Sequence, residues 1–156
     1  MNLSTTELEF LEQSNFIEGV YDSDSLDKAV KAWTYLKKQP ELTAKVVLKV
    51  HSTLMQGKLF AGERGKWRRC NVRVGSRICP DWQVIPYTMA NWLDSVGKTV
   101  DPDPIIFHVQ FEKIHPFVDG NGRVGRMIMN WMFLKQNKPV KIFTEEGRFE
   151  YYKLFH

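Results

Sequence analysis

The sequence lacks long hydrophobic runs. None of its 156 residues falls in an apolar stretch that approaches the ~20 residues a helix needs to span a bilayer. The segment Met1–Glu7 has neither the basic start nor the apolar core of a secretory signal. We therefore expect a cytoplasmic protein without a membrane partner, while export by a route that needs no such signal stays open.

Cysteine is scarce as well. The chain has two, Cys70 and Cys79, and no other Cys or His completes a zinc-binding spacing. Because the expected compartment is reducing, we predict two free thiols. Internal repeats, low-complexity tracts and long linkers are also absent, so residues 1–156 are predicted to form a single domain.

Core-forming residues and local positive charge are plentiful. Hydrophobic residues make up 43% of the chain, which argues against disorder, and the net charge is a mild +4. Six basic residues nevertheless fall within residues 64–77 with no acid among them. They are Arg64, Lys66, Arg68, Arg69, Arg73 and Arg77. Three interpretations fit this cluster: a solvated hairpin face, a rim for nucleotide phosphates, or a nucleic-acid surface.

Apolar spacing predicts a mostly α-helical fold with one small β-hairpin. Recurrence at three and four residues predicts helices over about 6–16, 26–38, 86–95, 104–113, 122–136 and from 145 to the end, and another with Pro40 in its first turn that ends at Gly57. We expect Thr5 or Thr6 to cap the first helix and Asp103 to cap the helix from 104. Alternation around the turn Gly75–Ser76 predicts the hairpin within residues 68–84.

One segment, residues 115–126, carries most of the chemical information. Gly120–Asn121–Gly122 offers three backbone N–H groups in a chain free to adopt positive φ, which predicts an anion-binding nest. The helix that follows directs its positive end to the same place. Arg123 and Arg126 lie three residues apart on one face of that helix. Together these groups suit a di- or triphosphate.

Two further side chains complete this candidate site. Asp119 stands at the mouth of the nest, where a carboxylate beside bound phosphates is a natural Mg²⁺ ligand. His115 comes just before it, where an imidazole could take a proton from an attacking hydroxyl. Each feature alone is most often a turn, a cap or a surface residue, but their coincidence within twelve residues favours a site. Phe117 is expected to anchor the loop in the core.

The segment resembles in full the signature of the Fic family, His-Pro-Phe-x-x-Gly-Asn-Gly-Arg-x-x-Arg. The similarity extends to residues 105–114 before it, to Met127–Asn130 after it, to Gly65–Arg68 at the start of the hairpin, and to Tyr151–Tyr152 near the end. The resemblance thus implies a Fic-type helical bundle with a hairpin "flap" over nearly the whole chain.

The resemblance also implies an activity, the transfer of AMP from ATP to a Ser, Thr or Tyr hydroxyl of a target protein, with Mg²⁺. The implied roles are a general base for His115, metal binding for Asp119, phosphate binding for Gly120, Asn121 and Gly122, stabilisation of the leaving phosphates for Arg123 and a γ-phosphate contact for Arg126. The flap, about residues 71–82, would hold the target by strand-like pairing. The target could be the chain itself, and because dimers are common among relatives a homodimer is left open.

A second motif, Ser14-Asn15-Phe16-Ile17-Glu18-Gly19, resembles the family's autoinhibitory signature. It implies an inhibitory helix over about residues 6–19, marked by Ser14, Glu18 and Gly19. Glu18 would pair with Arg126 and compete with the γ-phosphate. By itself the motif would read as an ordinary helix end.

The sequence also allows alternative functions. Glu18 could serve removal of AMP, and relatives transfer UMP, phosphocholine or a terminal phosphate from the same kind of pocket. Gly122 and Arg126 favour AMP transfer, because the phosphate-transferring branch carries Lys in place of Gly122. A nucleic-acid-binding regulator using residues 64–77 is a remote alternative, since no reading helix or RNA-binding motif is present, and intact His115 and Asp119 argue against a silent nucleotide-binding module.

Overall fold

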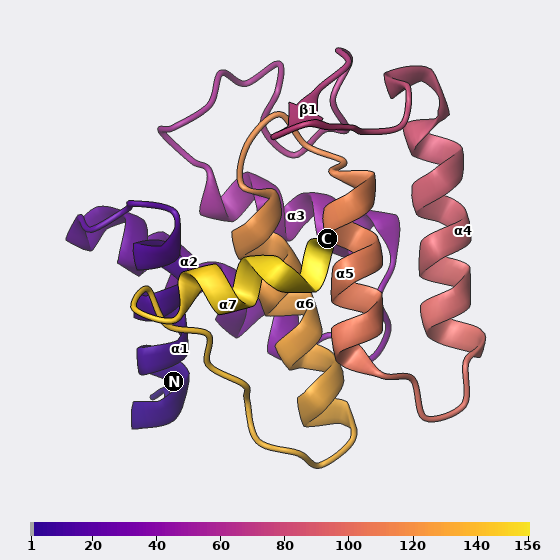
Figure 1. Cartoon of the computed structure of the whole chain (residues 1–156). Helices are drawn as coiled ribbons and strands as arrows, with labels where there is room; N and C mark the ends of the chain where they lie inside the picture. The colour runs from indigo at the N-terminus through magenta and orange to yellow at the C-terminus, as the bar shows by residue number, and fades with distance from the viewer. Residues whose placement is uncertain (1) are drawn as a thin grey trace.

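The computed structural model describes residues 2–156 and is mostly α-helical, as the sequence predicts (Figure 1). Within those residues the α-helices are α1 (Thr5–Ile17), α2 (Ser23–Lys37), α3 (Ala44–Leu54), α4 (Ile85–Lys98), α5 (Pro104–Ile114), α6 (Asn121–Lys135) and α7 (Arg148–Tyr152). Two 3-10 helices, η1 (Trp82–Val84) and η2 (Lys153–Phe155), precede α4 and follow α7. The one sheet in this range has two antiparallel strands, β1 (Arg73–Val74) and β2 (Arg77–Ile78).

Helix α6 is the centre of the bundle. It contacts α1, α2, α3 and α5, and α7 crosses in front of it (Figure 1). Apart from Gly122, every residue from Asn121 to Met132 is buried. A helix that is covered on all sides needs apolar residues around much of its circumference, which Val124, Met127 and Met129 help to supply. The polar start of α6 therefore lies inside the protein, at the end next to the hairpin.

Helix α1 is fixed by a capping box with a wider role. The N-cap is Ser4, not the predicted Thr5 or Thr6: the Ser4 side chain accepts from the Glu7 N–H while Glu7 accepts from the Ser4 N–H. Glu7 also accepts from Trp33 Nε1 at 3.0 Å and from Lys37 Nζ at 2.6 Å, both on α2. Partial burial raises the pKa of Glu7, but these hydrogen bonds lower it more, to about 2.

Two other predicted helix starts were wrong. The third helix begins at Ala44 with Thr43 as its N-cap, so Pro40 lies in the preceding loop. The helix starts after Thr43 because the Thr43 hydroxyl accepts a hydrogen bond from the Val46 N–H. A proline side chain cannot accept such a bond. The last helix begins at Arg148 rather than near Glu145. The predicted Asp103 cap of α5 is confirmed.

Other features agree with the sequence analysis. Cys70 and Cys79 are free thiols, one exposed and one buried. Among the described residues, no helix is both long and apolar enough to cross a bilayer.

Replacing Glu7 with Gln should lower the free energy of unfolding by about 1–3 kcal/mol at pH 7, because charge-assisted bonds to α2 are lost. The folded-state pKa of Glu7 is depressed, so its contribution is fully present above its unfolded value of 4.5 and is lost as pH falls through about 2. Urea unfolding should therefore show a difference from the wild type that shrinks between pH 5 and pH 2. Glu9→Gln, at an exposed position of the same helix, serves as the control; an equal effect of both changes would contradict the assignment.

Candidate active site

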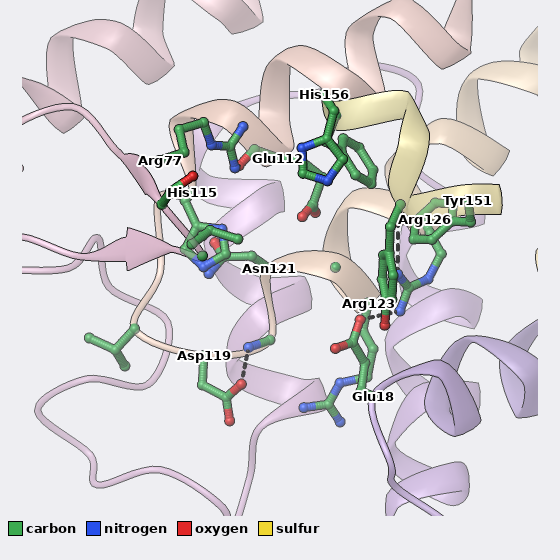
Figure 2. A pocket seen from close by; sticks show the side chains of 18 residues that line it. Glu18, Arg77, Glu112, His115, Asp119, Asn121, Arg123, Arg126, Tyr151 and His156 are labelled. Atoms are coloured by element: carbon green, nitrogen blue, oxygen red, sulfur yellow. Dashed lines mark hydrogen bonds and ion pairs between the residues drawn. The ribbon is translucent and has the colours of Figure 1, made fainter. Parts of the chain in front are cut away.

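A pocket of about 540 Å³ opens where α5 ends and α6 begins (Figure 2). Every residue of the predicted site lines it except Ser14 and Gly19: His115, Asp119, Gly120, Asn121, Gly122, Arg123, Arg126 and Glu18. The flap contributes residues 74–77, and the last helical segment contributes residues 151, 152, 155 and 156. The structure thus brings together the central motif, the end of α1 and the closing helix.

The loop before α6 is held by aromatic stacking. Phe117 is fully buried, the core anchor that the sequence predicts, and its ring stacks on His51 of α3 with centroids 3.7 Å apart and planes 3° apart. His51 accepts from the Gly65 N–H at Nδ1 and donates from Nε2 to the Asp119 carbonyl, each at 2.9 Å. Burial lowers the pKa of His51 to about 4, so the ring is neutral at neutral pH.

The Asn121 side chain has a structural role and does not face a ligand. Its Oδ1 accepts from the Phe117 N–H and its Nδ2 donates to the Phe117 carbonyl, both at 2.8 Å. Only 3% of the residue is exposed. The prediction that Asn121 binds phosphate is therefore restricted to its backbone N–H.

The first turn of α6 presents free backbone donors. Gly120 is the N-cap with φ 87°, and no side chain caps the helix. A Cβ at Gly120 would lie 2.9 Å from Met55 Sδ, so both the conformation and the space require glycine. The N–H groups of Asn121, Gly122 and Arg123 have no intrahelical acceptor and point out of the positive end of the helix. Such a helix start binds anions.

The two arginines of α6 are both buried but differ in their partners. Arg123 is 5% exposed; its Nη2 makes only a weak contact with Met55 Sδ at 3.3 Å, and its Nε is buried without a hydrogen-bond partner. Arg126 is 2% exposed and fully engaged. Its Nε and Nη2 donate to the hydroxyl and carbonyl of Ser14, at 2.8 and 2.9 Å, and Nη2 also donates to Glu18 Oε1 at 2.7 Å.

Glu18 thus occupies the pocket beside the start of α6. It is the C-cap of α1, followed by Gly19 at φ 70°, and its side chain is 37% exposed. A Cβ at position 122 would lie 2.3 Å from Glu18 Oε1 and 2.9 Å from Arg126 Nη1. Only a glycine at 122 lets this ion pair sit against the helix start, so the carboxylate lies where an anionic ligand of α6 would bind.

His115 lines the pocket at the end of α5. It is the C-cap of α5 in the left-handed conformation (φ 53°, ψ 63°), which turns the chain toward Phe117. Its Nδ1 is buried without a hydrogen-bond partner. Burial lowers the pKa of His115, the nearby Glu112 carbonyl raises it, and the positive charges of Arg77 and Arg68 lower it further. The net shift is downward, which favours the neutral ring.

The pocket holds carboxyl groups in two different environments. Asp119 is exposed, and its Oδ1 accepts from the Gly120 N–H at 2.8 Å, which orients the carboxylate toward the nest. Burial raises the pKa of Glu112 to about 7, and its Oε1 has no hydrogen-bond partner. No group of three or more His, Cys, Asp or Glu side chains within residues 2–156 could enclose a metal ion. Any metal here would therefore need a bound ligand to supply further oxygens.

Comparison with known proteins decides the family. The model of the Fic/DOC family matches residues 41–133, more than half of the chain. This chain belongs to the Fic/DOC family.

The relatives agree with this assignment. The chain is 34% identical over 118 residues to protein adenylyltransferase Fic of Drosophila erecta, an alignment that covers 72% of this chain and 24% of the relative. This Fic/DOC chain thus spans about a quarter of the length of the curated relatives it matches. A Fic-domain-containing signaling protein from Bacteroides thetaiotaomicron superposes with TM-score 0.80 at 18% identity, over 96% of this chain and 70% of that one. BepC of Bartonella tribocorum, solved with AMPPNP, gives TM-score 0.56 at 16% identity, over 78% and 68%.

Sequence reasoning missed the support of Arg126 from the last helix. Arg126 Nη1 donates to the Tyr151 hydroxyl at 2.9 Å, and that hydroxyl lies 2.8 Å from His108 Nε2 on α5. Burial lowers the pKa of His108 to about 3, so the ring beside the Tyr151 hydroxyl is neutral. The sequence of this Fic/DOC chain resembles the family at Tyr151–Tyr152, but only the fold shows that the Tyr151 hydroxyl accepts a hydrogen bond from Arg126.

The basic cluster of residues 64–77 does not form one exposed surface. Arg68 is 2% exposed and Arg77 lines the pocket. Arg68 donates to the carbonyls of His115 (2.7 Å), Cys70 (2.8 Å), Pro80 (2.6 Å) and Ile114 (3.3 Å), and its own N–H donates to the Pro116 carbonyl. One buried guanidinium thus joins both ends of the flap to the end of α5. Nothing in sequence spacing distinguished it from the exposed Arg69.

Replacing Arg68 with Met should destabilise this Fic/DOC domain by about 3 kcal/mol or more, because several buried carbonyls lose their donor. Urea unfolding measures the loss, and amide hydrogen exchange should show faster exchange across residues 69–82. Arg69→Met, at an exposed neighbouring position, should change stability by less than about 0.5 kcal/mol. If the two variants unfold alike, Arg68 does not hold the flap.

Proposed function

We propose that this chain is a protein adenylyltransferase that transfers AMP from ATP to a hydroxyl of a protein, with His115 as the general base. One observation carries the proposal: a neutral imidazole, the uncapped start of α6 and two buried guanidinium groups share a single pocket. The names of the curated relatives support it, and BepC, a protein of similar fold, was solved with the ATP analogue AMPPNP.

The phosphates would bind at the start of α6. The free N–H groups of residues 121–123 supply donors and the helix supplies a positive end, which together suit an oligophosphate. Arg123 has a buried Nε with no partner, and a phosphate oxygen would satisfy it. Arg126 would hold the terminal phosphate. Because these groups are fixed before the ligand arrives, they stabilise charge without reorganisation.

His115 would act through Nε2. In the tautomer with its proton on Nδ1, the ring keeps a lone pair on Nε2 that can accept a proton. The acceptor hydroxyl gives its proton to Nε2 as its oxygen forms a bond to the α-phosphorus of ATP. The bond from that phosphorus to the bridging oxygen breaks, and pyrophosphate leaves. The acceptor is a Ser, Thr or Tyr side chain on a target protein or on the chain itself.

Asp119 would hold Mg²⁺ together with phosphate oxygens. A single exposed carboxylate at the mouth of the nest fits magnesium, which is usually bound by one or two carboxylates plus substrate phosphates. The ion would neutralise charge on the phosphates. Without them the described residues offer too few ligands to enclose it, so metal and nucleotide should bind together.

Glu18 would inhibit this activity. Its carboxylate holds Arg126 Nη2 at 2.7 Å and lies against the glycine that opens α6. A γ-phosphate needs the same guanidinium, so Glu18 and ATP compete. Ser14 holds the other edge of Arg126, and Gly19 lets the chain turn away after the carboxylate. The inhibitory element is therefore α1 together with residues 18 and 19.

Removal of AMP is the second candidate function. Glu18 lines the pocket with a side chain that is 37% exposed, so the carboxylate could also orient a water toward a modified target. Transfer of another phosphate-containing group from the same pocket is a third. Nucleic-acid binding loses its structural support, because Arg68 is buried and Arg77 faces the pocket.

Incubation with α-labelled ATP tests the proposal. Native protein should label itself weakly. The Glu18→Gly variant should label itself at least about tenfold more strongly, because the charge-assisted hydrogen bond from Arg126 to Glu18 no longer competes with ATP. Adding His115→Ala to the Glu18→Gly variant should reduce its labelling ~10²–10⁴-fold. Labelling is read by gel and mass spectrometry.

Two results would contradict it. Equal labelling of native and Glu18→Gly protein would remove the inhibitory role, and label that survives in the His115 variant would remove the mechanism. Parallel γ-labelled ATP separates AMP transfer from phosphate transfer, and loss of AMP from pre-labelled protein reports the removal activity.

The pH dependence of labelling tests the state of His115. A general base must be unprotonated, and the pKa of His115 is lowered from 6.5. In Glu18→Gly protein the rate should stay constant from pH 8 to about 6.5 and fall only at lower pH. ATP affinity at each pH separates binding from chemistry. A rate that already halves above pH 6.5 at constant affinity would rule out a depressed pKa.

A further inference from the structure

Arg77 of the flap reaches into the pocket and has an unsatisfied nitrogen. The residue lines the cavity, and its Nη1 is buried without a hydrogen-bond partner. Its Nη2 donates only one long bond, 3.3 Å, to the Glu112 carbonyl. Buried polar groups nearly always have partners, so an exception needs an explanation, and a catalytic role is one.

The hairpin geometry fixes this orientation. Val74 pairs with Arg77 and Arg73 pairs with Ile78, so each pair shares a face. Val74 and Arg77 line the pocket, whereas Arg73 and Ile78 are exposed and do not. The same two-residue strands thus carry one arginine inward and one outward.

Arg77 lies at the opposite end of the pocket from Arg126. Figure 2 shows Arg77 beside Glu112 and His115, while Arg126 lies with Glu18 and Tyr151 on the other side. Glu18 neutralises Arg126, but no carboxylate within residues 2–156 lies within ion-pair distance of Arg77. The pocket therefore has a separate cationic group at its His115 end.

We propose that Arg77 binds the α-phosphate of the nucleotide, the group that undergoes transfer. The inference rests on the proposed function, because phosphates placed at Arg123 and Arg126 put the α-phosphate toward His115. In that position Nη1 would gain the acceptor that it lacks. The positive charge would stabilise the non-bridging oxygens of the α-phosphate while the acceptor oxygen bonds to phosphorus and pyrophosphate leaves.

The placement on the flap has a consequence for the reaction. If the flap also holds the target segment, one hairpin would present the acceptor hydroxyl and the charge that stabilises its attack. Arg68 donates hydrogen bonds to the His115 carbonyl and to carbonyls at both ends of that hairpin, so the same side chain helps to position both His115 and Arg77. Arg77 would thus act as a catalytic residue contributed from outside the signature segment.

Binding of AMP and of inorganic pyrophosphate to Glu18→Gly protein, measured by calorimetry, tests this assignment. AMP carries only the α-phosphate, whereas pyrophosphate should occupy the Arg126 end. Arg77→Gln should weaken AMP binding roughly 10- to 100-fold, the value of one or two charge-assisted hydrogen bonds, and leave pyrophosphate binding within about twofold. Arg73→Gln removes the same charge from the outer face of the flap and should change neither. Arg77→Lys should give an intermediate AMP affinity, since it keeps the charge but not the fork.

Unchanged AMP binding in Arg77→Gln would overturn the inference. Equal weakening of AMP and pyrophosphate binding would also overturn it, because Arg77 would then act through its charge on the whole pocket and not by contact with the α-phosphate. AMP that fails to bind Glu18→Gly protein at all would overturn the inference and the proposed function together. AMP bound normally but unaffected by Arg77 leaves the proposed function standing, so the two failures are distinguishable. Thermal unfolding of Arg77→Gln beside Arg73→Gln confirms that each variant is folded.

Discussion

A buried positive charge on the central helix governs the arrangement of this protein. Arg126 is 2% exposed, and a guanidinium out of water must have acceptors. They come from both ends of the chain: Ser14 and Glu18 on α1, and Tyr151 on α7. Burial alone lowers the pKa of Arg126, but Tyr151 and Glu18 raise it more, so the site is built to keep the charge. The terminal helices dock where they do partly because this charge requires them.

The same charge would let the proposed inhibition by Glu18 and the proposed binding of ATP share one site. Ser14 and Tyr151 hold Nε and Nη1, so the guanidinium keeps its place whatever happens at Nη2. Under the proposed function, only the Glu18 contact would need to change when a phosphate binds. A carboxylate that is 37% exposed is easier to displace than a buried one, because water can solvate it once it leaves. Glu18 is therefore the most exposed of the three residues that contact Arg126, and Ser14 and Tyr151 are both buried.

Arg68 is a second buried cation, and it organises the other side of the pocket. Its acceptors are all backbone carbonyls, at the end of α5 and at both ends of the flap. Carbonyls at a helix C-terminus carry partial negative charge, so a guanidinium is the natural partner. The hairpin itself has only two residues per strand and could not be stable alone. Hydrogen bonds from this one side chain therefore help to fix the position of the hairpin next to the end of α5.

Much of the fold and the central site followed from the sequence, because both depend on local signals. Apolar spacing located the helices, Asp103 and Gly120 marked two of their ends, and the order of residues 115–126 predicted a nest at a helix start. The starts of α1 and α3 were misplaced because several residues there compete as caps, and hydrogen bonds across the fold decide between them. Ser4 is the N-cap of α1 because it exchanges hydrogen bonds with Glu7, and the Glu7 carboxylate also accepts from Trp33 and Lys37 on α2.

What the sequence alone determined is therefore the chemistry available: which groups can bind phosphate, accept a proton or hold a metal, and that they stand close along one stretch of chain. Only the tertiary structure decided which of them face the pocket. The Asn121 side chain bonds to the backbone of Phe117, and the buried Arg68 joins the flap to the end of α5. Arg77 faces the pocket, and Tyr151 contacts both His108 and Arg126. These choices join residues more than a dozen positions apart, or depend on which face of a strand or loop is covered, and both are properties of packing that spacing along the chain does not encode.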